Sequence, residues 1–534
     1  MSRQSTSDGP LYESLLATSA EPSRAQIRAS AAVVPWRRDS RGNLQVYWVR
    51  RARSVPFMGG WHAFPGGGLS KRDLNVEVDG AVDGLRRDHV TLPTADPTDL
   101  ESLALAPDEV PGLVACTLRE LFEETGLWPG AESGAMDLDA LADARRRLLD
   151  KTVDMGALAG ELGRPLDASS LVFAGRWLTP PFAPMRFDNR FFLLEWPADR
   201  ALQPSMMGRE LDLGEWIDPA AAYERWLDGE VLAAPPILHI LRVLTQHGPQ
   251  RGLGRLLHPE EANLGPMRRI EFRPGVIMLP LRTPTLPPAT HTNAFLLGRG
   301  DAVLVDPATP FSDEQDRFLA ALDAAREQGY TVREIWLTHH HSDHVGAVDR
   351  VRDHLGAPVL AHPDTAAALT ARGIQVDGEL YDGRRVVLDG APPITVTVHH
   401  TPGHARGHLC FFDETFRTLI AGDLISTLST IVVDPPDGDM DAYLDSLARM
   451  AALDARITFP SHGPGTLEHR AKMEEYRVHR LEREEQVLAA HQTGRTTPEA
   501  MVAEIYADVP AFVHPVACRQ IRAHLDRLKK HGRI

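Results

Sequence analysis

The chain has 534 residues, a formal net charge of −16 and a hydrophobic content of 43%. A chain of this length is expected to form about three to four domains, and its apolar content is sufficient for ordinary globular cores. The negative charge disfavours indiscriminate coating of nucleic acid, although a local basic groove beside a metal could still hold phosphates. No run of about 18 apolar residues occurs, so we expect no transmembrane helix.

The N-terminus and the cysteines together indicate a cytoplasmic protein without a membrane partner. Residues 1–24 are polar and lack the apolar core of a signal peptide or an anchor. Cys116, Cys410 and Cys518 show neither paired nor metal-like spacing, so each is best explained as a small buried side chain. A disulfide framework is therefore not expected, and a reducing compartment fits this cysteine usage.

The first part of the chain contains two strand-like runs and two motifs. The runs cover residues 31–35 and 44–49, and turn-forming residues separate them. The motifs are Trp-His-Ala-Phe-Pro-Gly-Gly-Gly at 61–68 and Arg-Glu-Leu-Phe-Glu-Glu-Thr-Gly-Leu at 119–127. The second motif predicts a helix that stops near its glycine, because glycine commonly ends helices.

Three carboxylates share one face of this predicted helix. Glu120, Glu123 and Glu124 fall at positions i, i+3 and i+4. Like charges at this spacing destabilise a helix unless something neutralises them. A hard divalent cation such as Mg²⁺ or Mn²⁺, bound together with a substrate diphosphate, would do so. The alternative, an amphipathic helix with a solvated acidic face, does not explain why both motifs occur in one chain.

The two motifs resemble the two ends of a Nudix box, and the resemblance extends over residues 28–245. It implies an α/β/α sandwich in which Glu120, Glu123 and Glu124 bind Mg²⁺ or Mn²⁺. One of these glutamates would also orient the attacking water, and Arg119 would pair with a glutamate and hold it in place.

The box is split by an insertion at residues 71–112, which leaves Glu109 as a weak candidate for the remaining consensus glutamate. This split resembles the Nudix subgroup that includes the peroxisomal coenzyme A diphosphatases of animals. The coenzyme A signature is only partly kept: Arg51 and Gly60 match, whereas Pro56 and Met58 replace the expected Arg and His. The resemblance implies a nucleoside diphosphate derivative as substrate, with a coenzyme A-like molecule as one candidate.

A Gly-, Pro-, Arg- and His-rich stretch at residues 246–268 predicts a linker. Beyond it, strand-like runs at 276–279, 292–297 and 302–307 precede a predicted helix at 313–328. The order of these elements predicts a second α/β domain.

A cluster of metal ligands follows directly after the apolar run 335–337. Four potential ligands lie within six residues: His339, His341, Asp343 and His344. Neutral imidazoles and carboxylates suit zinc, and so short a set must recruit partners from further along the chain. Three such partners follow at the ends of later apolar runs: His404, Asp423 and His462. A His-rich surface turn would explain the first cluster but not the whole ordered set.

This ordered set resembles the metallo-β-lactamase superfamily, which implies an αββα sandwich with two zinc ions at one sheet edge. The resemblance implies that His339, His341 and His404 bind one ion, that Asp343, His344 and His462 bind the other, and that Asp423 bridges both. His340 occupies the free position of the motif. Asp306 resembles an aspartate that supports the metal loop.

Two zinc ions would lower the pKa of a shared water and polarise a phosphoryl or carbonyl oxygen, while Asp343 orients that water. His408, near His404, is open to three interpretations: a residue that positions a ligand, a proton donor or a packed histidine.

The C-terminal part contains predicted helices at 470–491, 497–507 and 516–530. They resemble the winged-helix tail of the β-lactamase-like protein 2 group, which includes endoribonucleases selective for single-stranded RNA. From residue 474 onward, ten Lys and Arg face nine Asp and Glu, so the tail has a charge of about +1 and is no strong nucleic-acid patch. A role in covering the metal cleft or a dimer face is at least as well supported.

The sequence therefore predicts a multidomain α/β and α+β hydrolase with two activities. The expected parts are an N-terminal extension (1–27), a Nudix domain (28–245), a linker (246–268), a metallo-β-lactamase-fold domain (269–470) and a winged-helix-like tail (471–534). RNA phosphodiester is the best substrate prediction for the zinc site, with single-stranded RNA as the partner. Thioester hydrolysis of the glyoxalase II kind is the rival, and the third alternative is a domain that serves only as a binding scaffold.

Overall fold

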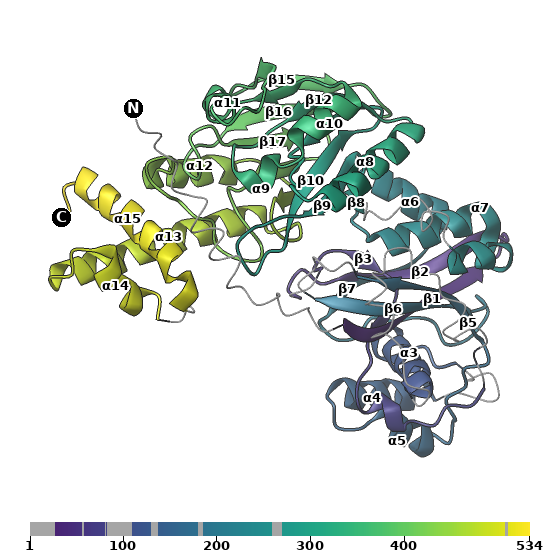
Figure 1. Ribbon diagram of the computed structural model, residues 1–534. Coiled ribbons are helices and arrows are strands. Elements are labelled where there is room, and N and C mark those ends of the chain that lie inside the picture. Colours follow the sequence, from purple (N-terminus) through teal and green to yellow (C-terminus); the bar gives the residue numbers. More distant parts are fainter. Residues whose placement is uncertain are drawn as a thin grey trace. The chain divides into compact units, whose positions relative to one another are not determined.

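The computed structural model describes most of the chain, with eight gaps between or before the described segments (Figure 1). The described residues are 27–55, 58–80, 82, 109–129, 137–179, 185–258, 270–507 and 511–534. They form two compact units, one built mainly from residues 25–266 and the other mainly from residues 275–534. The predicted N-terminal extension up to residue 26 and residues 83–108 of the predicted insertion lie outside the described residues.

The first unit is built on a mixed sheet in which the strands follow the order β3-β2-β1-β6-β5. Strand β4 pairs with β1, and β7 pairs with β2. The central strands β1 and β6 run parallel, with Ala31 opposite Arg190. The seven strands are β1 (Ile27–Arg38), β2 (Leu44–Arg51), β3 (His62–Ala63), β4 (Gly66–Gly68), β5 (Leu171–Leu178), β6 (Arg186–Glu195) and β7 (Leu211–Ile217).

Helices cover both faces of this sheet (Figure 1). They are η1 (Asp73–Asn75), α3 (Glu109–Thr125), α4 (Leu138–Leu149), α5 (Met155–Glu161), α6 (Pro219–Leu227) and α7 (Pro235–Leu257). Side chains alternate between the faces of a strand. Accordingly, Ala31 and Val33 of β1 pack with α3, α4 and α5, whereas Ala32 and Val34 pack with α6 and α7. The result is the predicted α/β/α sandwich.

Helix α7 continues into the segment predicted as a linker. The helix bends at Gly248, whose φ of 69° is open to glycine, and then continues to Leu257. The second half is retained because Leu256 is fully buried in the core of the first unit. The rest of the predicted linker, residues 259–268, lies outside the described residues.

The second unit contains two sheets that pack face to face. The first has the order β14-β13-β12-β11-β10-β9, and the second has the order β15-β16-β17-β18-β19. Ring contacts join the sheets, with Trp336 5.1 Å from Phe411 and Phe295 6.0 Å from Phe459.

The strands of the first sheet are β9 (Val276–Arg282), β10 (His291–Gly298), β11 (Asp301–Val305), β12 (Thr331–Trp336), β13 (Val359–Ala361) and β14 (Gly378–Glu379). The short strand β8 (Ile270–Arg273) precedes them. Those of the second sheet are β15 (Arg385–Leu388), β16 (Ile394–His400), β17 (Leu409–Asp413), β18 (Thr418–Gly422) and β19 (Ile457–Pro460).

Helices lie on the outer faces of both sheets and complete an αββα sandwich. Helices α8 (Ser312–Glu327), α10 (Val348–Leu355) and α11 (Pro363–Thr370) share a core with the first sheet. Helices α12 (Met440–Ala451) and α13 (His469–Gln492) share a core with the second sheet.

The C-terminal helices form a further small core of their own. Helix α13 packs with α14 (Pro498–Ile505) and α15 (His514–Lys530), and the 3-10 helix η4 (Ala511–Val513) leads into α15. Helix α14 begins at a side-chain cap, because the Thr497 side chain accepts from Ala500 N–H. Among the described residues, no helix combines the length and the apolar character that crossing a membrane requires.

Candidate metal centres

The predicted zinc ligands meet because four strands end at the same edge of the αββα sandwich. His339 and the short helix α9 (Ser342–Val345) follow β12, and Asp423 directly follows β18. His404 and His462 follow β16 and β19. Strand β17 is antiparallel to both β16 and β18, and β19 is parallel to β18, so the three ligand-bearing strands of this sheet run in one direction. Their carboxyl ends therefore lie together.

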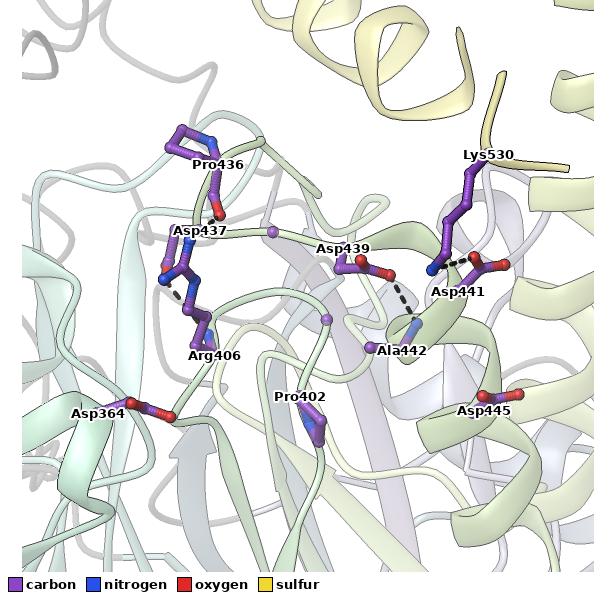
Figure 2. A pocket seen from close by; sticks show the side chains of 12 residues that line it. Asp364, Pro402, Arg406, Pro436, Asp437, Asp439, Asp441, Ala442, Asp445 and Lys530 are labelled. Atoms are coloured by element: carbon purple, nitrogen blue, oxygen red, sulfur yellow. Dashed lines mark hydrogen bonds and ion pairs between the residues drawn. The ribbon is translucent and has the colours of Figure 1, made fainter. Parts of the chain in front are cut away.

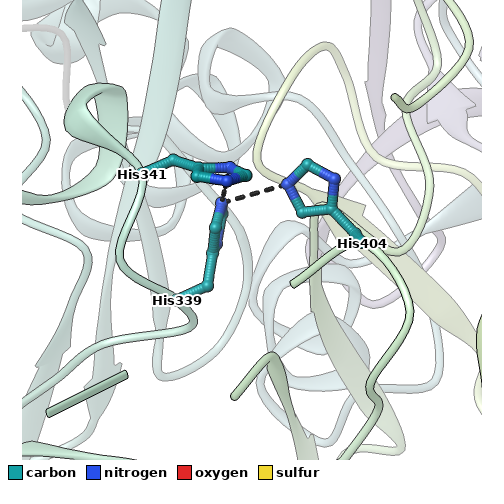
Figure 3. Close-up of side chains that lie close together, drawn as sticks. All are labelled: His339, His341 and His404. Atoms are coloured by element: carbon teal, nitrogen blue, oxygen red, sulfur yellow. Dashed lines mark hydrogen bonds between the residues drawn. The ribbon is translucent and has the colours of Figure 1, made fainter. Parts of the chain in front are cut away.

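Three histidines turn ring nitrogens toward one another (Figure 3). His339 Nε2 lies 3.0 Å from His341 Nδ1 and 3.2 Å from His404 Nε2. His339 is fully buried, and burial together with the neighbouring imidazoles holds its pKa well below the usual value. Neutral rings that converge in this way direct several lone pairs at one point, which is the arrangement of a metal ligand set.

A second group lies beside the first. Asp343, His344 and His462 are all buried, and each offers a ligand atom within 4.8 Å of the others. The distance from His462 Nε2 to Asp343 Oδ2 is 3.7 Å. This separation is too long for a hydrogen bond and leaves room for an ion between the two atoms.

Asp423 lies between the two groups and turns one carboxylate oxygen to each. Its Oδ2 lies 3.6 Å from His404 Nε2, while its Oδ1 lies 3.5 Å from His344 Nε2 and 3.4 Å from His462 Nε2. Burial opposes ionisation of Asp423, but the charges of His462 and His344 hold its pKa well below the usual value. Asp423 Oδ1 and His344 Nε2 are buried without a hydrogen-bond partner. Such atoms require an explanation, and a shared cation supplies one.

The outer ring nitrogens of the histidines are held by the protein. His404 Nδ1 donates to Val432 O at 2.6 Å, and His462 Nδ1 donates to His291 O at 3.1 Å. His344 Nδ1 lies 2.9 Å from Asp306 Oδ2. These contacts place the proton on Nδ1 and leave Nε2 free to bind a metal.

Asp306 supports the metal loop, as the sequence predicts. Its Oδ1 accepts from Thr338 N–H at 2.8 Å, and its Oδ2 accepts from Thr338 Oγ1 at 2.6 Å. Together with the contact to His344, these bonds tie the end of β11 to both ends of the ligand loop.

In the first unit, Arg119 pairs with acidic side chains close to the glycines at positions 66–68 of the Nudix box. Its Nη1 lies 2.8 Å from Glu120 Oε1 and 3.0 Å from Glu123 Oε2. Glu124 Oε2 accepts from Gly66 N–H at 2.8 Å. Helix α3 thus places Glu120 and Glu124 beside strand β4, and Arg119 joins Glu120 to Glu123.

Burial raises the pKa of each of these carboxyl groups. The pKa of Glu120 rises to about 7, that of Glu123 rises, and that of Glu124 lies well above the usual value. Burial therefore disfavours the charged form of these carboxyl groups, and a bound cation would favour it. Within the described part of the chain, these groups do not form a compact set of three ligand atoms.

Three family models match consecutive parts of the chain. The "NUDT19 Nudix domain" model matches residues 22–244, the "Metallo-beta-lactamase superfamily" model residues 287–462 and the "Beta-lactamase associated winged helix domain" model residues 497–534. A β-lactamase-like protein 2 homolog of Caenorhabditis elegans is 31% identical over 243 residues, which cover 45% of this chain and 79% of the relative.

The chain belongs to the metallo-beta-lactamase superfamily. Its Nudix domain precedes the metallo-β-lactamase domain, the winged helix follows it, and both catalytic folds belong to hydrolase families. An atrochrysone carboxyl ACP thioesterase of Aspergillus chevalieri is 30% identical over 235 residues, or 42% of this chain and 70% of the relative. A Nudix hydrolase structure from Alicyclobacillus acidocaldarius is 28% identical, covers 42% of this chain and 94% of its own, and has a TM-score of 0.33.

His408 of the metallo-β-lactamase domain contacts the backbone of Asp423, as expected for a residue that positions a ligand. Its Nε2 accepts from Asp423 N–H at 2.9 Å, and its Nδ1 lies 2.8 Å from Thr401 Oγ1. Burial lowers its pKa to about 3, so the ring is neutral and both nitrogens are engaged. It fixes the backbone that carries Asp423.

Sequence reasoning missed Asp437, which lies beside the three-histidine group. Its Oδ2 is 3.9 Å from His341 Nε2 and 3.7 Å from His340 Nε2. His340 thus turns toward this carboxylate, outside the two ligand groups that Asp423 joins. No local motif marks Asp437, because it lies about 100 residues beyond the histidines in the sequence.

Asp73 is an acidic partner of Arg119 that the sequence analysis did not identify, because an insertion splits the Nudix box. It is 1% exposed, and its Oδ1 lies 2.8 Å from Arg119 Nε. Glu109, the weak candidate, starts α3 and is eleven residues before Glu120, about 16 Å along the helix axis. The available signal was position: Asp73 follows Gly68 by five residues, at the start of the predicted insertion.

Proposed function

We propose that the protein is a bifunctional metal-dependent hydrolase. The Nudix domain would use Mg²⁺ or Mn²⁺ to cleave a nucleoside diphosphate derivative, for which a coenzyme A-like molecule is one candidate. The metallo-β-lactamase domain would use two zinc ions held by His339, His341 and His404 and by Asp343, His344 and His462. The observation that carries the second assignment is Asp423, whose two oxygens face the two groups separately.

In the zinc domain, the ions would polarise the scissile carbonyl and lower the pKa of a water. Side chains of the protein orient the ligand atoms and the attacking water. The fixed outer nitrogens keep the inner ring nitrogens of His404, His344 and His462 aimed at the two ion sites, and Asp343 can hold the attacking water and accept its proton. Asp423 fixes the position of one ligand group relative to the other because it contacts both.

The substrate of the zinc domain is best assigned from the charge of a neighbouring cavity (Figure 2). The cavity has a volume of about 550 Å³ and includes Asp437, the residue next to His341. Its wall carries five aspartates against one arginine and one lysine: Asp364, Asp437, Asp439, Asp441, Asp445, Arg406 and Lys530. Lys530 is paired with Asp441 at 2.8 Å.

This wall supports a thioester as the substrate over RNA. An RNA strand needs several cations along its path, and an acidic wall would repel its phosphates. The cavity volume lies within the range of small-molecule sites, which is about 300 to 1,000 Å³. The thioesterase named among the relatives supports the same choice. RNA phosphodiester, the substrate predicted from the sequence, remains the alternative that the experiment below tests.

In the Nudix domain, Mg²⁺ or Mn²⁺ would neutralise the buried carboxylates and the substrate diphosphate together. Arg119 holds Glu120 and Glu123 in one orientation, and Asp73 fixes Arg119 from the other side. Glu124 is anchored by Gly66 N–H and faces the box glycines. One of these glutamates can then orient the attacking water.

A substrate screen of the intact protein tests both assignments. It would compare coenzyme A, nucleoside diphosphate derivatives, single-stranded RNA and an acyl-glutathione, each with and without chelator. We expect diphosphate cleavage that falls about a hundredfold or more in Glu123→Gln, and thioester cleavage that is lost in Asp423→Ala. Each variant serves as the control for the other activity. RNA cleavage that disappears in Asp423→Ala would return the zinc domain to the endoribonuclease assignment.

A further inference from the structure

The loop formed by residues 431–437 carries outer contacts of the three-histidine group. Val432 O accepts from His404 Nδ1 at 2.6 Å. Asp437 Oδ2 lies 3.9 Å from His341 Nε2. The loop therefore provides the outer hydrogen bond of His404 and places a carboxylate near His341.

The C-terminal helices hold this loop at the residues on either side of Val432. Arg480 of α13 donates through Nη2 to Ile431 O and through Nη1 to Gln520 Oε1, the latter at 3.0 Å. Gln520 of α15 donates through Nε2 to Val433 O at 3.4 Å. Arg480 is 1% exposed and Gln520 is 5% exposed, so water does not compete for these carbonyl groups.

Further contacts fix the rest of the loop. Arg519 Nη1 lies 2.7 Å from Asp434 Oδ2. Just beyond the loop, Asp441 in the first turn of α12 pairs with Arg527 at 2.6 Å and with Lys530 at 2.8 Å, both from α15. Helix α15 thus contacts the loop near its start and the helix that follows its end.

We propose that Arg480 and Gln520 are positioning residues through which the winged-helix tail sets the metal affinity of the three-histidine site. The reasoning rests on the proposed dinuclear centre. When the carbonyl groups of Ile431 and Val433 are held, Val432 O stays in line with His404 Nδ1, and His404 Nε2 stays aimed inward. Contacts of this outer kind change metal affinity by about 10- to 100-fold when they are removed.

The effect is specific to one half of the centre. His462 takes its outer contact from His291 O, and His344 takes its contact from Asp306, neither of which belongs to the 431–437 loop. A less firmly held loop should therefore lower the affinity of the site formed by His339, His341 and His404 for its ion. The ion at the other group should be affected much less.

Conservative variants of the full-length protein test this. Gln520→Glu keeps an acceptor for Arg480 but removes the donor to Val433 O, and Arg480→Lys keeps the charge but cannot span both partners. Zinc affinity would be measured by chelator competition, and the surroundings of each ion by the absorption spectrum of the cobalt(II)-substituted protein. We expect one of two ions to bind about tenfold more weakly, with a changed spectrum and a nearly unchanged second ion.

Arg495→Ala is the matched control, because it removes an ion pair to Glu504 within the tail that does not touch the loop. It should leave both affinities unchanged. Should either buried variant fail to fold, the partly exposed pair Arg519 and Asp434 provides the same test. Arg519→Asp should weaken one ion, and Arg519→Asp combined with Asp434→Arg should restore it.

The possible failures are distinguishable. A wild-type protein that binds no zinc would overturn the proposed function and this inference with it. A wild-type protein that binds two ions, with folded Gln520→Glu and Arg519→Asp variants that bind both equally well, would overturn the inference alone.

Discussion

Asp423 joins both halves of the proposed zinc centre, since each of its oxygens faces a different group. Asp423→Ala should therefore lose bound zinc and hydrolysis together. Asp343→Ala should retain at least one zinc but lose most turnover, because the proposed task of Asp343 is to orient the water. Metal content by elemental analysis, measured beside thioester hydrolysis, separates the two effects. His340→Ala, which alters no predicted ligand, should keep both ions, and full zinc retention in Asp423→Ala would contradict the bridging role.

The Glu120 carboxyl predicts how pH affects the Nudix domain. Burial raises its pKa to about 7 from the ordinary value of 4.5. Between these values the folded state binds more protons than the unfolded state, so the free energy of unfolding of the metal-free domain falls as pH rises. Mg²⁺ competes with these protons, so it should raise the melting temperature more at pH 8 than at pH 6.

Glu120→Gln should reduce this pH dependence, to which Glu123 and Glu124 also contribute, whereas Glu195→Gln, at an exposed position at the end of β6, should not. Thermal unfolding at several pH values, with and without Mg²⁺, measures both. A Mg²⁺ effect that is the same at pH 6 and pH 8 would contradict the assignment.

Among single residues, the sequence predicts those that belong to a motif. It misses those whose roles depend on contacts with residues far away in the sequence. His339, His341 and Asp343 share one short stretch, so their chemistry is visible from spacing. Asp437 and Asp73 are single aspartates whose roles come from long-range contacts, to His341 and to Arg119. Backbone acceptors such as Val432 O carry no sequence signal at all, because every residue has a carbonyl group.

Among the elements, the close approach of β4 to α3 explains a glycine in the Nudix site. A Cβ atom on Gly67 would lie 2.3 Å from Glu120 Oε1, whereas a Cβ atom on Gly68 would meet nothing within 4 Å. Gly67→Ala should therefore displace the Glu120 carboxylate and lower diphosphatase activity at least tenfold, in line with the loss of a group that positions the metal.

Gly68→Ala is the matched control and should retain nearly full activity. Steady-state kinetics of both variants, together with their Mg²⁺ affinity, test the contact between β4 and α3. Equal activity in the two variants would show that this contact does not position Glu120.

Helix α7 shows where element prediction from local composition fails. The Gly-, Pro-, Arg- and His-rich composition of residues 246–268 predicts a linker, since glycine and proline usually interrupt helices. The chain does bend at Gly248, but Leu256 is buried, and this tertiary packing continues the helix beyond the bend. By contrast, the strands around the zinc ligands were predictable, because their apolar runs are bounded by turn residues.

For the whole molecule, the two units have separate hydrophobic cores, one around Phe192 and Trp128 and the other around Phe318 and Leu304. Ligands should therefore stabilise them separately. Calorimetry of the intact protein should show two unfolding transitions. Free zinc at about 100 times its Kd should raise the free energy of unfolding of one unit by about 2.7 kcal/mol. Mg²⁺ with a diphosphate should raise the unfolding temperature of only the other unit.

Asp423→Ala assigns the transitions, since it should remove the zinc shift and leave the Mg²⁺ shift in place. Glu123→Gln should do the reverse. A single transition whose temperature is raised by both metals would mean that the two domains unfold as one cooperative unit. In that case the loss of zinc would also destabilise the Nudix site, and the two activities would fall together when zinc is removed.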